Sequence, residues 1–206
     1  AQDGTVYILG GNKVTNLRQL IHNKLNSLNS FCPCIRCREV KNKTNCLNYT
    51  RIVEKKYISS GGTEYFISME SGNSHDSQFI DGKWYNNGKL EPGIIYGFAR
   101  LRLPSEYNEK IPELKGCSFL RELHVYGEVI SNKNKNNIQH TGIGKKLMKK
   151  VEQISYYNKY YKIAVISGIG VRNYYKKLGY TLSNTFMIKH LSNRYYFIYF
   201  TILLFY

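Results

Sequence analysis

The sequence predicts an α/β domain, α+β in the looser sense, in which a mixed central sheet is flanked by helices. Two observations carry this prediction. Between residues 49 and 130, short apolar runs alternate with loops rich in glycine, serine and asparagine, which is typical of strands joined by hairpins. From residue 138 onward, a glycine-containing loop, a helical pattern, an apolar strand and a second helical pattern follow in order. Such an alternation is typical of α/β proteins.

The composition provides enough apolar residues for one good-sized domain, together with a strongly basic charge. Of 206 residues, 42% are hydrophobic and 14% are aromatic. Because 30 Lys and Arg stand against 14 Asp and Glu, the formal net charge is +16. This balance indicates an anionic partner such as nucleic acid, a polyphosphate cofactor or a membrane surface, without choosing among them. A/T-rich genomes also produce many Lys and Asn codons, so a merely solvated basic surface stays open.

Residues 1–48 are interpreted as a linker with one helix and a cysteine knuckle. The chain begins without an initiating Met or a secretory signal, so we expect a piece of a longer protein. Leu17, Leu20, Ile21 and Leu28 fall on one helical face. Five cysteines, three of them within six residues, do not form the pattern of a secreted disulfide framework. They favour a reducing, cytoplasmic compartment.

Three of the cysteines predict a metal site. Cys32, Cys34 and Cys37 form C-x-C-x-x-C, compact enough for the thiolates to share a tetrahedral Zn²⁺ at about 2.3 Å. A fourth ligand is required, and Cys46 is the nearest thiol. Free buried thiols are the competing interpretation, and the pattern is not the C-x-x-x-C-x-x-C of radical S-adenosylmethionine enzymes, whose thiolates hold an iron–sulfur cluster. The sequence cannot rank the other candidates for the fourth ligand, which are His22, His75, Cys117 and His124.

Three runs in the middle of the chain predict strands. Residues 63–70, 94–103 and 119–130 are rich in β-branched and aromatic residues and are separated by polar loops. Within the last run, Glu122 and His124 alternate onto one face of the strand. They are candidates for ordering a catalytic water or polarising a carbonyl. A purely structural Glu and His are the commoner alternative.

A glycine-broken loop precedes an amphipathic helix. Gln139, Gly142 and Gly144 form Q-x-x-G-x-G, after which apolar residues recur at helical spacing over 143–154. Glycines let backbone N–H groups approach a phosphate, and a helix start adds unpaired donors and a positive dipole end. The pattern matches neither a dinucleotide-binding loop nor a Walker loop. A pyrophosphate site and a tight turn packed on the sheet both remain open.

The C-terminal part predicts a strand over 162–170 and a short helix over 171–180 that stops at Gly179. A hydrophobic tail, residues 191–206, closes the chain, and its last twelve residues, 195–206, carry no charge. Twelve residues are fewer than the ~20 that a membrane-spanning helix needs. A truncated or interfacial membrane anchor, an edge strand and a translated artefact remain alternatives for this tail.

Several motifs identify a known family. "LRELHVYG", "QHTGIGKKLM" and "AVISGIGVRNYYKKLGY" resemble, in this order, the acetyltransferase domain of the Elongator catalytic subunit, a member of the Gcn5-related N-acetyltransferase superfamily. "CPCIRCREV" and "GGTEYF" resemble the family's preceding segments, so the resemblance runs roughly from Cys32 to Lys189, with divergent stretches at 71–92 and 104–118. It implies a Gcn5-related N-acetyltransferase fold over residues 49–190, after a zinc-linker remnant.

The resemblance implies a role for the glycine-broken loop. Residues from Gln139 to Gly144 would bind the pyrophosphate of acetyl-CoA through the backbone N–H groups of Ile143, Gly144 and Lys145. Lys145 and Lys146 would add positive charge, against the alternative of a solvated helix face. The cysteine cluster would hold Zn²⁺, as in related linkers.

The resemblance also implies roles for the segment "NYY". Asn173 and Tyr174 would lie beside the cofactor. Tyr175 would protonate the departing CoA thiolate, which suits a phenol with a pKa of about 10 because it stays protonated at neutral pH. The alternative is that these tyrosines only pack.

The family modifies the wobble uridine of tRNA at C5 with a group drawn from acetyl-CoA. It uses a radical S-adenosylmethionine domain with an iron–sulfur cluster, for which this sequence has no motif. We therefore expect an acetyl-CoA- and tRNA-binding acyltransferase that is incomplete alone, with other Elongator-type subunits as partners, in the cytoplasm or attached to an organelle membrane through the tail. Protein lysine acetylation of the histone or tubulin type, with Glu122 as base, and a catalytically silent binding module are the alternatives.

Overall fold

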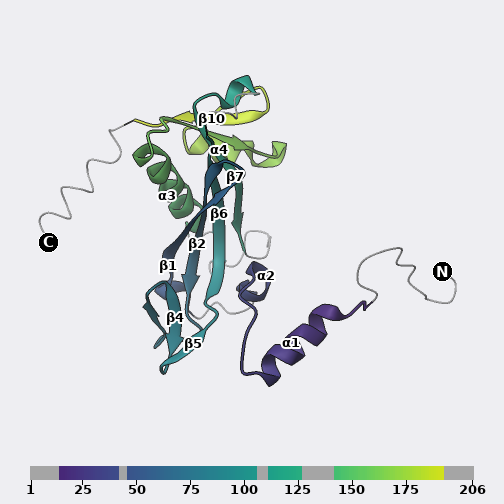
Figure 1. Ribbon diagram of the computed structural model, residues 1–206. Coiled ribbons are helices and arrows are strands. Elements are labelled where there is room, and N and C mark those ends of the chain that lie inside the picture. Colours follow the sequence, from purple (N-terminus) through teal and green to yellow (C-terminus); the bar gives the residue numbers. More distant parts are fainter. Residues whose placement is uncertain (1–13, 42–45, 106–110, 127–141, 193–206) are drawn as a thin grey trace, which may run out of the picture. The chain divides into compact units, whose positions relative to one another are not determined.

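The computed structural model describes residues 14–41, 46–105, 111–126 and 142–192 (Figure 1). Gln139 and nearly all of the hydrophobic tail lie outside the described residues. The chain divides into two compact units, Ala1–Arg38 and Glu39–Tyr206. Within the described part of the chain, no helix combines the length and the apolar character needed to cross a membrane.

The smaller unit contains two helices, α1 (Leu17–Ser27) and α2 (Ile35–Arg38). α1 confirms the helix predicted from the spacing of apolar residues. None of its residues is buried, and Leu20 and Ile21 are 47% and 46% exposed. The described residues of this unit therefore form no apolar core, so we expect any stability of the cysteine knuckle to depend on what its thiols bind.

The larger unit is built on a mixed seven-stranded sheet. Neighbouring strands are antiparallel except for one parallel pair, β7 with β8. A parallel pair needs a crossover connection, and the helix α3 (Ile143–Tyr157) lies between these two strands in the chain. In spatial order the strands are β1 (Arg51–Ser59), β2 (Gly62–Ser71), β6 (Ile94–Leu103), β7 (Cys117–Val125), β8 (Lys162–Ile166), β10 (Phe186–His190) and β9 (Thr181–Ser183).

A small sheet is inserted between β2 and β6. It consists of β3 (Gln78–Ile80), β4 (Lys83–Asn86) and β5 (Lys89–Glu91). Asp-Gly and Asn-Gly pairs join its strands, and all four of these residues have positive φ, as tight hairpin turns require. Trp84 of β4 is 6% exposed and packs so closely on Gly93 that a Cβ there would lie 2.3 Å from the indole. Two aromatic side chains anchor the insertion to the main sheet, because Trp84 also donates to Glu70 of β2 and Phe79 of β3 lies under the guanidinium of Arg51 of β1.

α3 covers one face of the main sheet (Figure 1). Its residues Leu147, Met148 and Val151 are at most 1% exposed and pack against Ile67 of β2 and Leu101 of β6. The apolar spacing predicted this helix, and it is confirmed. The predicted α/β class with a mixed sheet is confirmed as well.

Three predicted boundaries were wrong. The strand predicted over 119–130 is β7, which ends at Val125, so that Tyr126 is already outside the strand; residues 127–130 lie outside the described residues. The strand predicted over 162–170 ends at Ile166, because a 3₁₀ turn, η4 (Ile169–Val171), replaces its last part. The helix predicted over 171–180 is the shorter α4 (Arg172–Lys177), and Gly179 follows with φ 85°. Two more 3₁₀ turns are η1 (Leu47–Tyr49) and η2 (Pro112–Leu114).

Candidate functional site

The main sheet opens between its two parallel strands. β7 and β8 pair only from Cys117 with Lys162 to Leu120 with Val165. Beyond this point β7 continues to Val125, paired on its other side with β6. On the side of β7 where β8 pairs with residues 117–120, no strand in the described part of the chain pairs with residues 121–125. Backbone N–H and C=O groups along this edge can therefore bind an extended ligand.

The start of α3 lies at this opening. Gly142 is the N-cap, with φ 79°, and no side chain among the described residues caps the helix. An added Cβ on Gly144 would come within 3.6 Å of Val125, which places the helix start at the end of β7. The first N–H groups of a helix have no intrahelical partner, so this position can bind an anion. Ile143 is buried, whereas Lys145 and Lys146 are exposed and add positive charge.

Tyr174 of α4 reaches the same position. Its hydroxyl would lie 2.8 Å from a Cβ on Gly144, so glycine is required there for the phenol to approach. This hydroxyl is buried and has no hydrogen-bond partner among the described residues. Burial raises the pKa of Tyr174 to about 12, with smaller contributions from Tyr175 and Glu152. The phenol is therefore a protonated donor at neutral pH.

Tyr175 occupies a different environment. It is 6% exposed and belongs to the apolar core. Its ring packs between Tyr174 and Tyr180, at centroid distances of 5.3 and 5.8 Å, and burial raises its pKa. Asn173, the residue before this pair, is exposed. Of the two tyrosines, Tyr174 is the one whose hydroxyl contacts the helix start.

Buried polar atoms without a partner gather in this region. Within the described chain there are four such side-chain atoms, and three of them belong to Ser167, Arg172 and Tyr174. These residues lie between the end of β8 and the middle of α4. Since buried polar groups in proteins nearly always have partners, their concentration in residues 167–174 indicates a polar ligand or ordered water.

Glu122 and His124 point away from α3. Leu123 and Val125, which alternate with them, pack against the core under α3. Glu122 lies 3.5 Å from Arg100 in an ion pair whose side chains are 42% and 37% exposed. We call the sheet surface opposite α3 the outer face; it carries Phe66, Phe98, Arg100, Arg121, Glu122 and His124.

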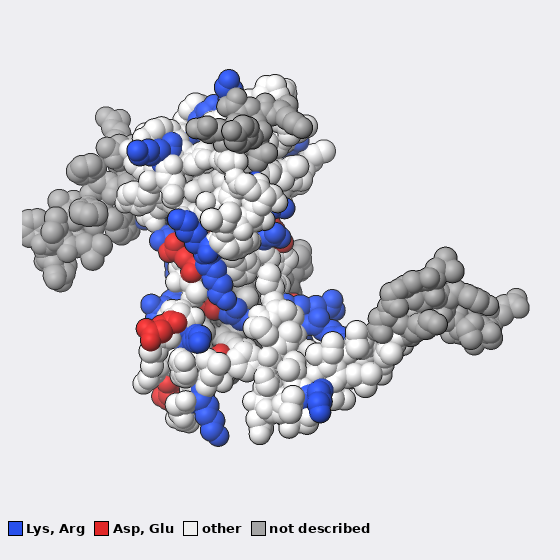
Figure 2. All heavy atoms as spheres, viewed as in Figure 1, with Lys and Arg blue, Asp and Glu red and all other residues white. Residues whose placement is uncertain are grey.

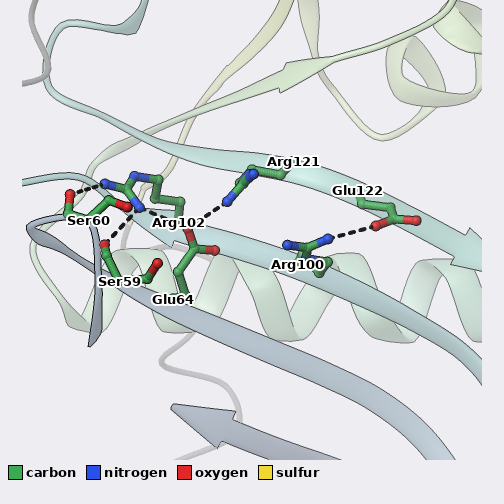
Figure 3. A network of polar contacts seen from close by, with 7 residues as sticks. All are labelled: Ser59, Ser60, Glu64, Arg100, Arg102, Arg121 and Glu122. Atoms are coloured by element: carbon green, nitrogen blue, oxygen red, sulfur yellow. Dashed lines mark hydrogen bonds and ion pairs between the residues drawn. The ribbon is translucent and has the colours of Figure 1, made fainter. Parts of the chain in front are cut away.

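A buried ion network on the outer face was not predicted (Figure 3). Glu64 is 1% exposed, and its Oε1 accepts hydrogen bonds from Arg102 and Arg121, each at 2.9 Å. Arg102 also donates to the backbone carbonyls of Ser59, the last residue of β1, and of Ser60 in the turn that follows. Charged residues at alternate positions of two predicted strands, Glu64 in one and Arg100 and Arg102 in the other, were the signal for this network.

The three clustered thiols come together as the sequence predicted. The Sγ atoms of Cys32, Cys34 and Cys37 all lie within 4.8 Å of one another. His22 of α1 places its Nε2 3.1 Å from Cys37 Sγ. Cys46 belongs to the larger unit, where it is 3% exposed and burial raises its pKa.

The electrostatics of the cluster favour the thiolate form of Cys34 and the thiol form of Cys37. The backbone N–H and the thiol of Cys37 lower the pKa of Cys34 to about 6. The pKa of Cys37 is raised to about 11, first by burial and then by the neighbouring thiols. Arg18 donates to Cys37 Sγ at 3.0 Å, which adds a positive charge beside the sulfurs. Three thiols and an imidazole form a donor set that Zn²⁺ prefers.

Comparison with known proteins agrees with the geometry. Elongator complex protein 3 of Danio rerio is 35% identical over 185 residues, which cover 85% of this chain and 30% of that protein. A tRNA uridine(34) acetyltransferase of Methanocaldococcus jannaschii is 32% identical over 196 residues, covering 89% of this chain and 32% of that protein. No protein-family model matches the chain.

The fold has a solved counterpart. The archaeal Methanocaldococcus infernus Elp3 with an N-terminal deletion superposes with a TM-score of 0.65 at 33% identity, over 89% of this chain and 41% of that chain. The present chain thus spans about a third of the length of the curated relatives that it matches. The resemblance predicted from the motifs is confirmed: the chain is related in sequence and in fold to Elongator complex protein 3.

Proposed function

We propose that this chain is the acetyl-CoA-binding acyltransferase unit of an Elongator-like, tRNA-modifying protein. The observation that carries the proposal is the meeting of three features at one point. The start of α3 at Gly142–Gly144, the edge of β7 beyond Leu120 and the buried hydroxyl of Tyr174 lie together, and within the part of the chain that the structure describes none of the three has a partner. Acetyl-CoA supplies an acyl group activated as a thioester.

The residues at the helix start would hold the anionic part of this substrate. Backbone N–H groups of Ile143, Gly144 and Lys145 face outward at the positive end of the α3 dipole, which favours a pyrophosphate. Lys145 and Lys146 contribute charge rather than fixed geometry, because both are exposed. The edge of residues 121–125 offers backbone donors and acceptors to the amide groups of the pantetheine arm.

Tyr174 would donate a hydrogen bond to the substrate at the helix start. Its hydroxyl is buried there, has no hydrogen-bond partner among the described residues, and its pKa of about 12 keeps the proton available. Because this hydroxyl lies beside the proposed pyrophosphate site, it suits a phosphate oxygen rather than the thiolate at the other end of the pantetheine arm. Tyr175, predicted from its position in the motif as the proton donor to the thiolate, packs against Tyr174 and stays the candidate for that step. Tyr174→Phe should therefore weaken acetyl-CoA binding, whereas Tyr175→Phe should leave binding nearly intact and slow thioester cleavage. The reverse result would make Tyr174 the proton donor.

The proposed acceptor is tRNA. The net charge of +16 suits a polyanion, and the Methanocaldococcus jannaschii relative is named for tRNA uridine(34). Lys and Arg are spread over several places on the visible face rather than gathered in one patch (Figure 2). Modification at C5 of the wobble uridine would need radical S-adenosylmethionine chemistry and an iron–sulfur cluster, for which this chain has no motif. Elongator-type subunits and a cytoplasmic location follow from the same proposal.

Protein lysine acetylation is less well supported. It would need a general base such as Glu122, but this side chain is half-exposed, pairs with Arg100 and lies on the outer face. Acetyl-CoA cleavage should be measured with tRNA, with a lysine peptide and with neither. Stimulation by tRNA supports the proposal. Stimulation by the peptide alone would favour lysine acetylation, and no stimulation would favour a silent binding module.

We also propose that Cys32, Cys34 and Cys37 hold Zn²⁺, with His22 rather than Cys46 as the fourth ligand. His22 Nε2 already lies 3.1 Å from Cys37 Sγ within one compact unit. Metal content of purified variants tests this assignment: Cys34→Ser and His22→Ala should lose zinc, whereas Cys46→Ala should keep it. The reverse result for the last two variants would return the fourth position to Cys46.

A further inference from the structure

The outer face carries an ordered arrangement of rings and charges. Strand register places Lys55, Phe66, Arg100 and Glu122 in one row across β1, β2, β6 and β7. The next row toward the end of β7 places Phe98 beside His124. Side chains paired in this way lie on the same face of a sheet, so these residues form one continuous surface.

The rings of this surface form a connected series. Phe66 stacks on Phe98 at 5.3 Å, and Phe98 stacks on His124 at 5.7 Å, both nearly parallel. Tyr126 follows His124 at 4.5 Å, edge to face. Phe98 is 5% exposed, whereas His124 is exposed and Phe66 and Tyr126 are half-buried. The buried ring of Phe98 therefore fixes the position of the series, and the other three rings are accessible to solvent.

The guanidinium groups of Arg100 and Arg121 lie on the same face of the sheet as these rings, and Figure 3 shows the ion pairs that they make. Arg121 donates one N–H group to Glu64, and the Arg121 side chain remains 44% exposed. Arg100 pairs with Glu122 only at 3.5 Å and is 37% exposed, a weak interaction that a phosphate can replace. Arg121 interrupts the strand pairing at the bulge between β6 and β7, so its side chain emerges where the sheet begins to open.

We infer that this surface binds an unpaired stretch of RNA, with bases stacked on Phe66, His124 and Tyr126 and phosphates contacted by Arg100 and Arg121. Exposed rings interleaved with guanidinium groups suit single strands, because every base has a face to stack and every linkage a phosphate to pair. The inference rests on the proposed function and deepens it. It assigns the acceptor to the outer face, next to the same β7 segment whose edge faces acetyl-CoA.

The test measures binding of the full chain to two RNAs: a hairpin with an unpaired loop and a fully paired duplex with the same stem. His124→Ala and Tyr126→Ala should each weaken loop binding roughly tenfold and leave duplex binding unchanged. His124→Phe, which keeps a ring, should restore it. Arg100→Gln and Arg121→Gln should each reduce the salt dependence of loop binding by about one unit of log–log slope.

Matched controls come from the far end of α3. Tyr157→Ala removes a ring that is 64% exposed, and Lys159→Gln removes an exposed charge; neither lies on the outer face, so loop binding should not change. Circular dichroism melting confirms that each variant is folded. Wild-type loop affinity in all ring variants would overturn the inference while leaving tRNA as a partner. A wild-type chain that binds neither RNA would overturn the proposed tRNA role and the inference together.

Discussion

The two faces of the main sheet are built by different means. Under α3, residues such as Leu147 and Ile67 are fully buried and apolar. On the outer face, the most deeply buried groups include the carboxylate of Glu64 and the hydroxyl of Ser68, each 1% exposed. Apolar packing tolerates moderate volume changes, but a buried charge needs its partner. The outer face therefore has a defined arrangement of charges but is more easily destabilised by substitution. Such an arrangement is expected of a surface that recognises a polar ligand.

The largest expected effect comes from breaking the ion network. Glu64→Ala leaves Arg102, 13% exposed, without its buried partner, and should lower the free energy of unfolding by about 4 kcal/mol. Urea denaturation measures this loss. Glu64→Gln, which keeps the volume and one acceptor, should lose less. A loss below about 1 kcal/mol for Glu64→Ala would mean that the outer face does not depend on a buried ion pair for its stability.

Truncation on the α3 face should cost somewhat less. Leu147→Ala removes a fully buried side chain and should destabilise the chain by about 3 kcal/mol through lost burial and a cavity. Tyr157→Ala, on the exposed side of the same helix, serves as the control and should have little effect. If both substitutions destabilised the chain equally, the face of α3 that carries Leu147 would not be the face that packs on the sheet.

A smaller effect is expected where the α3 face does use polar groups. Tyr180 donates a hydrogen bond to the buried carboxylate of Glu152 at 2.9 Å, and Lys189 Nζ contacts the same carboxylate at 2.9 Å. Tyr180→Phe removes one bond while Lys189 still neutralises the charge, so a loss of about 1.5 kcal/mol is expected. Thermal melting checks it. An unchanged melting temperature would remove Tyr180 from the network that ties α3 to β10.

The smallest effect should come from the exposed pair of the outer face. Arg100→Gln breaks its contact with Glu122, but both side chains are more than a third exposed, so stability should change by less than about 1 kcal/mol. The RNA affinity of the same variant should fall at low salt. A large loss of stability without any change in RNA binding would make Arg100 a structural residue.

Local spacing in the sequence predicted one amphipathic helix and one cluster of thiols. The spacing from Ile143 to Ile154 predicted α3, and the C-x-C-x-x-C spacing predicted the clustering of Cys32, Cys34 and Cys37. These features depend on neighbours in the chain. The spacing of apolar residues along a helix and the spacing of cysteines can therefore be interpreted without knowledge of the fold.

Features that depend on distant partners were not readable. The partners of Glu64 lie 38 and 57 residues away, so only the strand register brings them together. Tyr174 and Tyr175 are adjacent on α4 and point in different directions, and the packing of Gly144 against one of them decides which reaches the site. The end of β7 at Val125 likewise depends on its pairing with β6, and the length of its open edge depends on where β8 stops pairing.

The central claim is that the start of α3 binds the pyrophosphate of acetyl-CoA, and calorimetric titration of Gly144→Asp with acetyl-CoA tests it most directly. A carboxylate at this position would repel the anion and displace Tyr174, so affinity should fall by at least about a hundredfold. Gly88→Asp, in a hairpin turn where an added Cβ meets nothing within 4 Å, is the control for the added charge. Because the φ of 73° at Gly88 strains any side chain, its folding is checked by circular dichroism, and the folded protein should bind like wild type. Unchanged affinity in a folded Gly144→Asp protein would contradict the account.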